Sequence, residues 1–249
     1  MRILLVLAVA ALAAGCVTTE TVQFRPKAQQ ETLVRDGQAA LISRRKSSLI
    51  LVKPAGRQIQ SGARPVFIVG ITNLTGAPLE FRMANIEVAQ IVNQQAMPLK
   101  VFTYEDLVAE ERNRQIAAAF FGGVAMAANS YSASRAGYYN RTSTVATPRG
   151  TYQVQTTGYS PTAAAIAQSN AAAQNEAIVS ATIERGQQNM AALEQGVIKD
   201  NTLLPGEWYG GQLHLQAPSS EGDGVKSYAI TMLVGSDRHE IEVVQGGSR

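Results

Sequence analysis

The chain changes its hydrophobic pattern twice, near residue 103 and near residue 200, and this division limits the folds open to it. Before residue 103, short runs of β-branched and aromatic residues end at Pro, Gly or Asn, which is typical of strands. Between residues 104 and 200, two long stretches have no such pattern and favour helices instead. After residue 206 the strand pattern returns.

Neither strand block has enough strands to be stable alone, so we expect both to join in one domain. The sequence therefore predicts a mainly β fold with an α insertion (α+β). Residues 47–103 plus 201–249 would form an antiparallel Ig-like β-sandwich. A helix–β-hairpin–helix insertion, residues 104–200, would interrupt this sandwich.

Both helices of the insertion have start signals. Thr103 and Asp106 have the spacing of a capping box, which predicts a helix over residues 104–134. A second helix is predicted over residues 161–198, because Ser160 can act as N-cap and is followed by a proline at the first helical position. This second segment is rich in Ala, Gln and Asn, so it buries little apolar area and needs close packing on a partner.

Two features of the insertion are not expected of a simple pair of helices. Thr-rich runs on both sides of Pro148-Arg149-Gly150 predict a β-hairpin over residues 138–159. The apolar stretch Ile116–Ala128 is too short to span a bilayer. It has three interpretations: packing on the second helix, association between copies of the chain, or contact with a membrane.

The first sixteen residues contain a positive charge at Arg2, an unbroken apolar run from Ile3 to Ala14, and the single cysteine of the chain, Cys16. The run is too short for a spanning helix and has the length of the hydrophobic part of a signal peptide. The sequence Ala13-Ala14-Gly15-Cys16 resembles the lipobox of bacterial lipoproteins, although that family usually has Leu where Ala13 stands.

This resemblance implies that residues 1–15 are a lipoprotein signal peptide and that Cys16 is lipidated, with enough acyl chains for stable anchoring. Val17 rather than Asp follows, which in that family implies a lipid anchor in the outer membrane, facing the periplasm. A secretory signal with a chance cysteine is the alternative. Residues 16–46 would then be the lipidated Cys and a tether, with a short helix or first strand around Glu31–Ser43.

Composition gives little support for catalysis. One Cys and two His fall short of the three protein ligands of catalytic zinc. No phosphate-binding Gly motif or nucleophile elbow is present, and the net charge of +3 is no nucleic-acid signal. We therefore expect no enzyme activity, catalytic residue, cofactor, metal or nucleic-acid partner. His214 is expected on the solvent or groove side of its strand, and His239 at an exposed edge.

The remaining candidates are residues for protein interactions. Gly122 and Gly123 would allow close approach of a neighbouring helix. Trp208 and Tyr209 are expected in the core or as a cap on the sandwich, or alternatively as an exposed aromatic platform. The full set of candidate interaction residues is Phe120, Phe121, Gly122, Gly123, Tyr138, Tyr139, Trp208 and Tyr209.

These observations predict a membrane-anchored component of the cell envelope that acts in assembly and has no catalytic role. Its partners would be the membrane, through lipidated Cys16, and either another envelope protein or further copies of itself. Two alternatives stay open. One is a periplasmic ligand- or glycan-binding lipoprotein, and the other is an oligomeric pore to which hairpin 138–159 contributes two strands.

Overall fold

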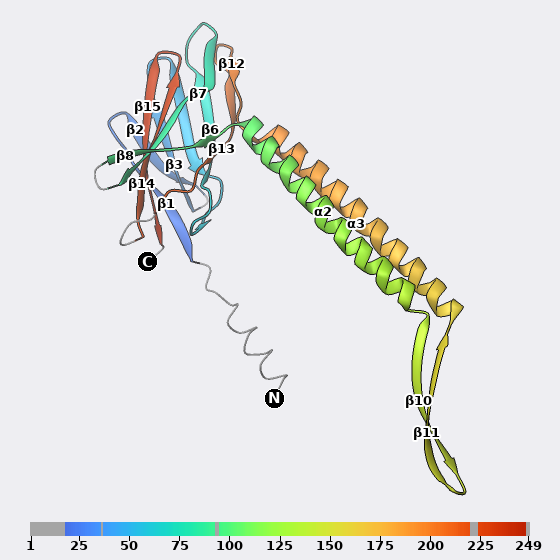
Figure 1. Ribbon diagram of the computed structural model, residues 1–249. Helices are drawn as coiled ribbons and strands as arrows, with labels where there is room; N and C mark the ends of the chain where they lie inside the picture. Colours follow the sequence, from blue (N-terminus) through green and yellow to red (C-terminus); the bar gives the residue numbers. More distant parts are fainter. Residues whose placement is uncertain (1–17, 36, 93–94, 220–223, 248–249) are drawn as a thin grey trace. The chain divides into compact units, whose positions relative to one another are not determined.

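The computed structural model describes residues 18–35, 37–92, 95–219 and 224–247, which are mostly strands with two long helices (Figure 1). The predicted signal peptide and Cys16 lie outside these residues. The chain divides into two compact units. Unit 1 comprises Met1–Leu107 with Glu194–Arg249, and unit 2 comprises Val108–Leu193.

Unit 1 contains two antiparallel sheets. The larger has the strand order β12-β7-β14-β15-β1-β5, with β8 also paired to β7, and the smaller has the order β2-β3-β4-β6-β13-β9. The strands of the larger sheet are β1 (Thr19–Arg25), β5 (Ile59–Gln60), β7 (Leu79–Val92), β8 (Gln95–Leu99), β12 (Asn201–Leu203), β14 (Lys226–Val234) and β15 (Asp237–Gly247). Those of the smaller sheet are β2 (Gln30–Arg35), β3 (Gln38–Arg44), β4 (Ser48–Pro54), β6 (Val66–Asn73), β9 (Val101–Phe102) and β13 (Trp208–Leu215).

One hydrophobic core contains side chains from both sheets. Burial alternates along β4 and β15, so every second residue of each strand contributes to this core. Phe67 of β6 lies at its centre, with ring-centroid distances of 6.3 Å to Tyr228 of β14 and 6.4 Å to Phe24 of β1. The prediction of a mainly β, antiparallel fold with two helices is confirmed at this level.

Residues 19–44 differ from the prediction of a tether, because they form β1, β2 and β3. β1 pairs with β15 over six residues. Its polar residue Glu20 is buried against Lys226 of β14, which explains why the hydrophobic pattern did not reveal the strand. In β3, Leu41 is fully buried. The region around Glu31–Ser43 is therefore strand rather than helix.

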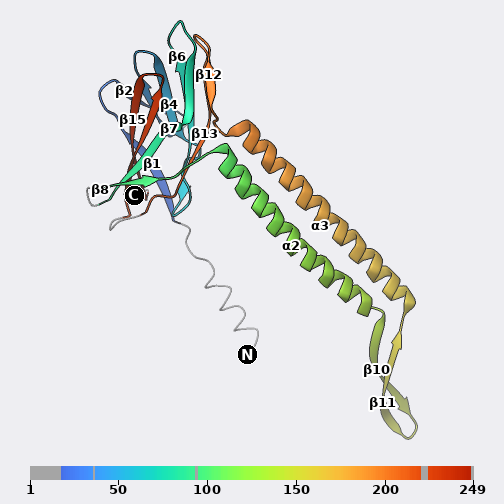
Figure 2. The same ribbon diagram turned by 45° about the horizontal axis from the view of Figure 1, so that its top comes forward.

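Unit 2 is built from α2 (Tyr104–Arg135), β10 (Tyr138–Thr147), β11 (Gly150–Tyr159) and α3 (Pro161–Gly196), although the first turn of α2 and the last residues of α3 belong to unit 1. The two helices run side by side, and the β10–β11 hairpin joins their far ends (Figure 2). At that junction, the backbone NH of Ser160 donates to the carbonyl of Gly137 at 2.7 Å.

Both predicted helix starts are confirmed by hydrogen bonds. Thr103 Oγ1 accepts from the backbone NH of Asp106 at 3.3 Å, and Asp106 Oδ2 accepts from the NH of Thr103 at 3.1 Å, which completes the capping box. At α3, Ser160 Oγ accepts from the NH of Ala163 at 3.3 Å. In the hairpin turn, Gly150 has φ of 136°, a conformation that L side chains rarely adopt.

Candidate functional site

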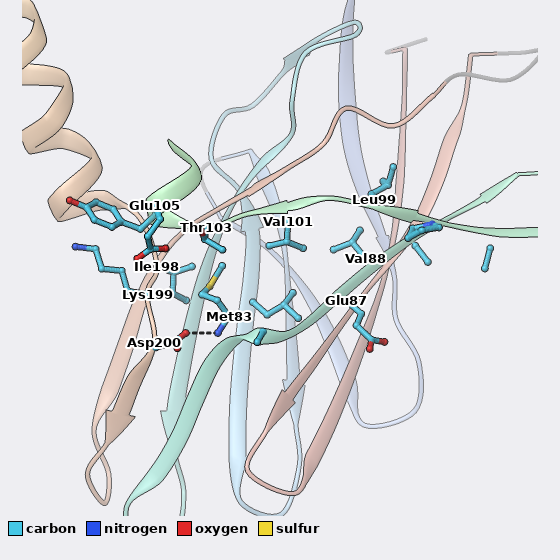
Figure 3. Close-up of a pocket in the computed structure, with 16 residues that line it drawn as sticks. Met83, Glu87, Val88, Leu99, Val101, Thr103, Glu105, Ile198, Lys199 and Asp200 are labelled. Carbon is cyan, nitrogen blue, oxygen red and sulfur yellow. Dashed lines mark hydrogen bonds between the residues drawn. The ribbon is translucent and has the colours of Figure 1, made fainter. Parts of the chain in front are cut away.

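A groove with a volume of about 1020 Å³ opens on unit 1 (Figure 3). It is lined by β7, β8, β9, the first residues of α2 and the segment that precedes β12. Its larger apolar side chains are Met83, Ile86, Val88, Leu99, Val101 and Ile198. Several of these belong to the core of unit 1, so the floor of the groove is rigid and apolar.

The polar groups at one end of the groove already bind one another. Asp200 Oδ1 accepts from the backbone NH of Met83 at 2.7 Å (Figure 3). Lys199 Nζ donates to Glu194 Oε1 at 2.8 Å and lies 4.0 Å from the ring centroid of Tyr104, whose hydroxyl also donates to Glu194. The hydrogen bonds from Lys199 and Tyr104 lower the pKa of the Glu194 carboxyl. These groups fix the start of α2 and the end of α3, and their arrangement suits an apolar ligand better than acid–base chemistry.

His239 lies in a buried polar cluster, so the prediction of an exposed edge is wrong. Its Nε2 is 2.9 Å from Ser48 Oγ and its Nδ1 is 2.9 Å from Ser43 Oγ. It shares a strand face with core residues such as Ile241, which places it between the sheets. Burial lowers the pKa of His239 to about 4.

This cluster does not have the geometry of a nucleophilic triad. Asp237 Oδ2 accepts from Ser48 Oγ at 2.8 Å, whereas a triad needs the carboxylate on the second nitrogen of the imidazole. That position is taken by Ser43, and both serines are fully buried. The cluster therefore connects β15 of one sheet to β3 and β4 of the other through hydrogen bonds.

In the part of the chain that the structure describes, no group of three or more His, Cys, Asp or Glu side chains is placed to hold a metal ion. His214, the other histidine, is half-buried on β13.

Unit 2 has polar side chains where a helical pair usually has its core. The carboxylate of Glu111 on α2 is buried, and its Oε1 accepts from Asn189 Nδ2 of α3 at 3.0 Å and from Gln115 Nε2 at 3.3 Å. Gln115 Nε2 also donates to the carbonyl of Gly186 at 3.3 Å. Gly186 leaves room for this contact, since a Cβ there would lie 3.0 Å from the Gln115 amide.

The same seam continues toward the hairpin through asparagines and small residues. Asn129 Nδ2 donates to Asn175 Oδ1 at 3.1 Å, and Asn175 Nδ2 donates to Ser130 Oγ at 3.4 Å. The buried positions nearest the hairpin are alanines, Ala133 on α2 and Ala164 on α3. The interface between the helices therefore combines these polar and small side chains with the half-buried apolar side chains of Met126, Ile178, Met190 and Leu193.

The large apolar side chains of α2 point away from that seam. Ile116, Phe120 and Val124 recur every four residues, which places them on one helix face, and Tyr131 continues it. At about 100° per residue this face lies opposite the seam residues Glu111 and Gln115. Ile116 is 69% exposed and Phe120 and Phe121 are each 68% exposed. The side chains of Ile116, Phe120 and Val124 therefore do not pack on α3, whereas Gly122 of the same stretch faces Ile178 of α3.

The segment that contains most of α2, the hairpin and the first part of α3 also has few charged residues. From Gln115 to Asn175 the only charged residues are Arg135, Arg141 and Arg149, and none is acidic. α2 is long enough and apolar enough, by length and composition, to cross a membrane, and its uncharged part is longer than the Ile116–Ala128 stretch. The segment thus combines exposed apolar side chains with purely positive charge.

The candidate aromatic residues of the hairpin lie at its base. Tyr138 and Tyr159 face each other across the strands, with ring centroids 5.0 Å apart. Tyr139 covers its cross-strand neighbour Gly158, because a Cβ on that glycine would lie 2.5 Å from the tyrosine hydroxyl. All three tyrosines remain exposed.

The other candidates divide between packing and exposure. Gly122 faces Ile178 of α3, where a Cβ would come within 3.4 Å, whereas no atom lies within 4 Å of the Cβ position of Gly123. Tyr209 packs against the core, and its hydroxyl accepts from the backbone NH of Lys199 at 2.9 Å. Trp208 is 65% exposed, so the prediction of a core or cap position is wrong for Trp208 and the exposed alternative applies.

Sequence reasoning missed the seam residues Glu111, Gln115, Asn129, Asn175 and Asn189, which determine how the helices of unit 2 associate. Their spacing was the available signal, since intervals of four residues (Glu111 to Gln115) and fourteen residues (Gln115 to Asn129 and Asn175 to Asn189) place them on one face of each helix. Comparison with known proteins adds no relative: no protein-family model, no curated protein and no solved structure matches this chain.

Proposed function

We propose that the protein is a lipid-anchored, non-catalytic assembly component of the bacterial cell envelope. In this proposal unit 1, an Ig-like sandwich, is the scaffold, and unit 2 provides the surface that binds another protein. The observation that carries the proposal is the reversed arrangement of unit 2, with polar side chains in the seam and large apolar side chains outside.

The exposed apolar side chains of α2 would be more stable if a partner buried them. Burial of one large apolar side chain stabilises a protein by about 1.5–3 kcal/mol. A helical pair that was selected to stay monomeric in water would place Ile116, Phe120 and Val124 in its seam. A chain that exposes them in a row gains this stabilisation only when a partner covers them.

Lipidated Cys16 would place unit 1 close to the bilayer, in the outer membrane and facing the periplasm by the resemblance to lipoproteins. β1 begins at Thr19, three residues after Cys16, and three extended residues span about 10 Å. β1 is held by six residue pairs with β15 and by the buried Glu20–Lys226 ion pair. In this proposal the first strand of unit 1 would therefore connect the domain to the lipid anchor through a linker of at most about 10 Å.

The test of assembly compares two double variants of the detergent-extracted full chain. Phe120→Ser with Phe121→Ser changes the exposed apolar surface of α2, and Val34→Ser with Leu204→Ser removes two exposed apolar side chains, 76% and 59% accessible, from unit 1. We expect the wild type and the unit 1 variant to form a discrete assembly by light scattering, and the α2 variant to lose it with unchanged helical circular dichroism. A monomeric wild type with no co-purifying protein would contradict the proposal.

The anchor is tested separately by mass spectrometry of the N-terminal peptide. We expect the mature chain to begin at Cys16 and to carry acyl chains, and Cys16→Ser to be released from membranes. An unmodified N-terminus at another residue would leave only the secretory interpretation.

The groove of unit 1 supports a second candidate function, the binding of an apolar ligand. Its volume is at the upper end of small-molecule sites, and its floor is apolar. Ala84 lines it and is exposed, so Ala84→Trp would fill it without disturbing the core. If the groove binds ligand, an apolar fluorescent probe should bind the wild type and lose affinity at least tenfold in Ala84→Trp.

A further inference from the structure

We propose that the β10–β11 hairpin joins the hairpins of other copies of this chain to form a β-barrel that crosses a lipid bilayer. This inference rests on the proposed assembly function and names its partner, a second copy. It follows from the two faces of the hairpin, its two edges, its length and its charge.

The two faces of the hairpin differ in polarity. The cross-strand register pairs Val145 with Tyr152 and Ser143 with Val154, so these side chains share one face, together with Tyr139 near the base. All the large apolar side chains between the base and the turn lie on this face, which also carries Arg141, Thr147 and Thr156. The opposite face carries uncharged polar side chains at every position between the base tyrosines and the turn except Ala146. These residues are Asn140, Thr142, Thr144, Thr151, Gln153, Gln155 and Thr157. Membrane barrels alternate in this way, with apolar side chains toward lipid and polar side chains toward the lumen.

Both edges of the hairpin are free to pair. Within the described residues, β10 and β11 form a sheet of two strands only, and their residues are exposed along almost their whole length. An isolated hairpin is marginally stable in water at best. The strands have ten residues each and pair from end to end, so the β10 edge of one copy and the β11 edge of the next match in length.

Such an interface is head-to-tail, because it joins two different edges. Head-to-tail interfaces build rings when the rotation closes. A closed barrel also removes every free edge, which an open stack of hairpins would retain. Each copy would supply two strands, so the strand number is even whatever the number of copies.

The strand length fits a bilayer. Ten residues at about 3.3 Å each span about 33 Å, and a tilt of about 40° reduces this to about 25 Å, the height of the apolar band of membrane barrels. Tyr139, at the base of the face that carries Val145 and Val154, corresponds to the aromatic girdle at the membrane surface. Arg149 lies in the turn at the opposite end.

Charge also favours lipid and a second copy over an unrelated soluble partner. The hairpin has no acidic residue, so nothing on its faces repels the anionic headgroups that its arginines can meet. Arg141 is the single charge on the apolar face, four residues into β10, from where its long side chain reaches the headgroups beside Tyr139.

The lumen would be water-filled only above a minimum size. An eight-stranded barrel is filled by its own side chains, whereas 16–18 strands leave an aqueous channel. With two strands per chain, a conducting barrel needs about eight copies or more. The polar face, with Thr, Gln and Asn only, predicts a channel that is weakly selective among small ions.

The test uses adjacent residues on opposite faces of β11. Full-length lipidated protein is reconstituted into planar bilayers of phosphatidylethanolamine and phosphatidylglycerol under a KCl gradient. We expect the wild type to form channels, Val154→Asp to lose them at least tenfold because a charge faces lipid, and Gln155→Asp to keep them with a shift of the reversal potential toward cation selectivity. Circular dichroism and light scattering of all three chains show that folding and assembly are retained.

The outcomes separate this inference from the proposed function. Assemblies that form in detergent and depend on Phe120 and Phe121, but give no channels, would overturn the barrel and leave the assembly role standing. Equal channel activity in Val154→Asp and the wild type would also overturn it. A monomeric wild type that gives no channels would overturn both proposals.

Discussion

Lys226 Nζ lies 2.7 Å from Oε1 and 2.8 Å from Oε2 of Glu20, and both side chains are almost completely buried. Removal of one partner from a buried ion pair leaves an uncompensated charge. We therefore expect Glu20→Gln to lower the free energy of unfolding of unit 1 by about 3–5 kcal/mol, measured by urea denaturation. The double variant Glu20→Gln with Lys226→Met is the control, and it should recover most of the loss.

The same ion pair predicts a sensitivity to acid. Burial alone would raise the pKa of Glu20, but hydrogen bonds from Lys226, Ser61 and Gln245 outweigh it, and the pKa is lowered below the ordinary value of 4.5. A carboxyl with a lowered folded pKa stabilises the protein above the unfolded pKa and loses that effect as the pH falls through the folded one. Unit 1 should therefore lose stability below pH 4.5, and less so in the double variant.

His239 gives a separate transition at higher pH. Its folded pKa of about 4 lies below the ordinary 6.5, so the unfolded chain binds a proton first. The stabilisation is complete above pH 6.5 and is lost as the pH falls toward 4, by about 3 kcal/mol. Urea denaturation at several pH values should show this slope in the wild type and in His214→Gln. His239→Gln should lack the slope, and an identical slope in His239→Gln would refute this assignment.

Trp208 lies over Gly70 on the neighbouring strand, where a Cβ would be 2.9 Å from the indole Nε1. Gly70→Ala should lift the indole away from the sheet. Because Trp208 is the single tryptophan, fluorescence reports its position alone, and we expect emission at longer wavelength. The side chain can swing into solvent, so the free energy of unfolding should change by about 0.5 kcal/mol or less. Gly76→Ala, with no atom within 4 Å, is the matched control.

Asn175 should hold the outer half of the helical pair together. Its amide donates to Ser130 Oγ and its carbonyl oxygen accepts from Asn129. Asn175→Ala leaves the Asn129 amide without this acceptor and should cost about 1–3 kcal/mol. Hydrogen exchange of the backbone around residues 126–133 should accelerate by one order of magnitude or more. Asn170→Ala, an exposed asparagine of the same helix, should leave the exchange unchanged.

The sequence predicted the elements whose signals are local. The capping box at Thr103, the N-cap at Ser160 and the turn at Pro148 determine helix and hairpin boundaries through neighbouring atoms, and the structure has them where the pattern indicated. The strands after residue 47 were predictable for the same reason, since their alternation is a property of the segment itself.

The features that depend on distant residues were not predictable. Glu20 looks like part of a polar tether until Lys226 and Gln245, more than 200 residues away, are placed beside it. His239 looks exposed between Arg238 and Glu240 until the phase of β15 places it in the core. The seam of unit 2 was missed because polar residues on a helix normally face water, and a helical pair that reverses this rule cannot be inferred from either helix alone.

The absence of acidic residues between Glu111 and Glu176 has a practical consequence for the intact protein. A glutamate-specific protease has no site there, whereas trypsin has five, after Arg112, Arg114, Arg135, Arg141 and Arg149. The sites after Arg141 and Arg149 lie on either side of the second half of β10. Tryptic peptides from a native membrane preparation would therefore report, without any substitution or label, whether the hairpin is free or enclosed.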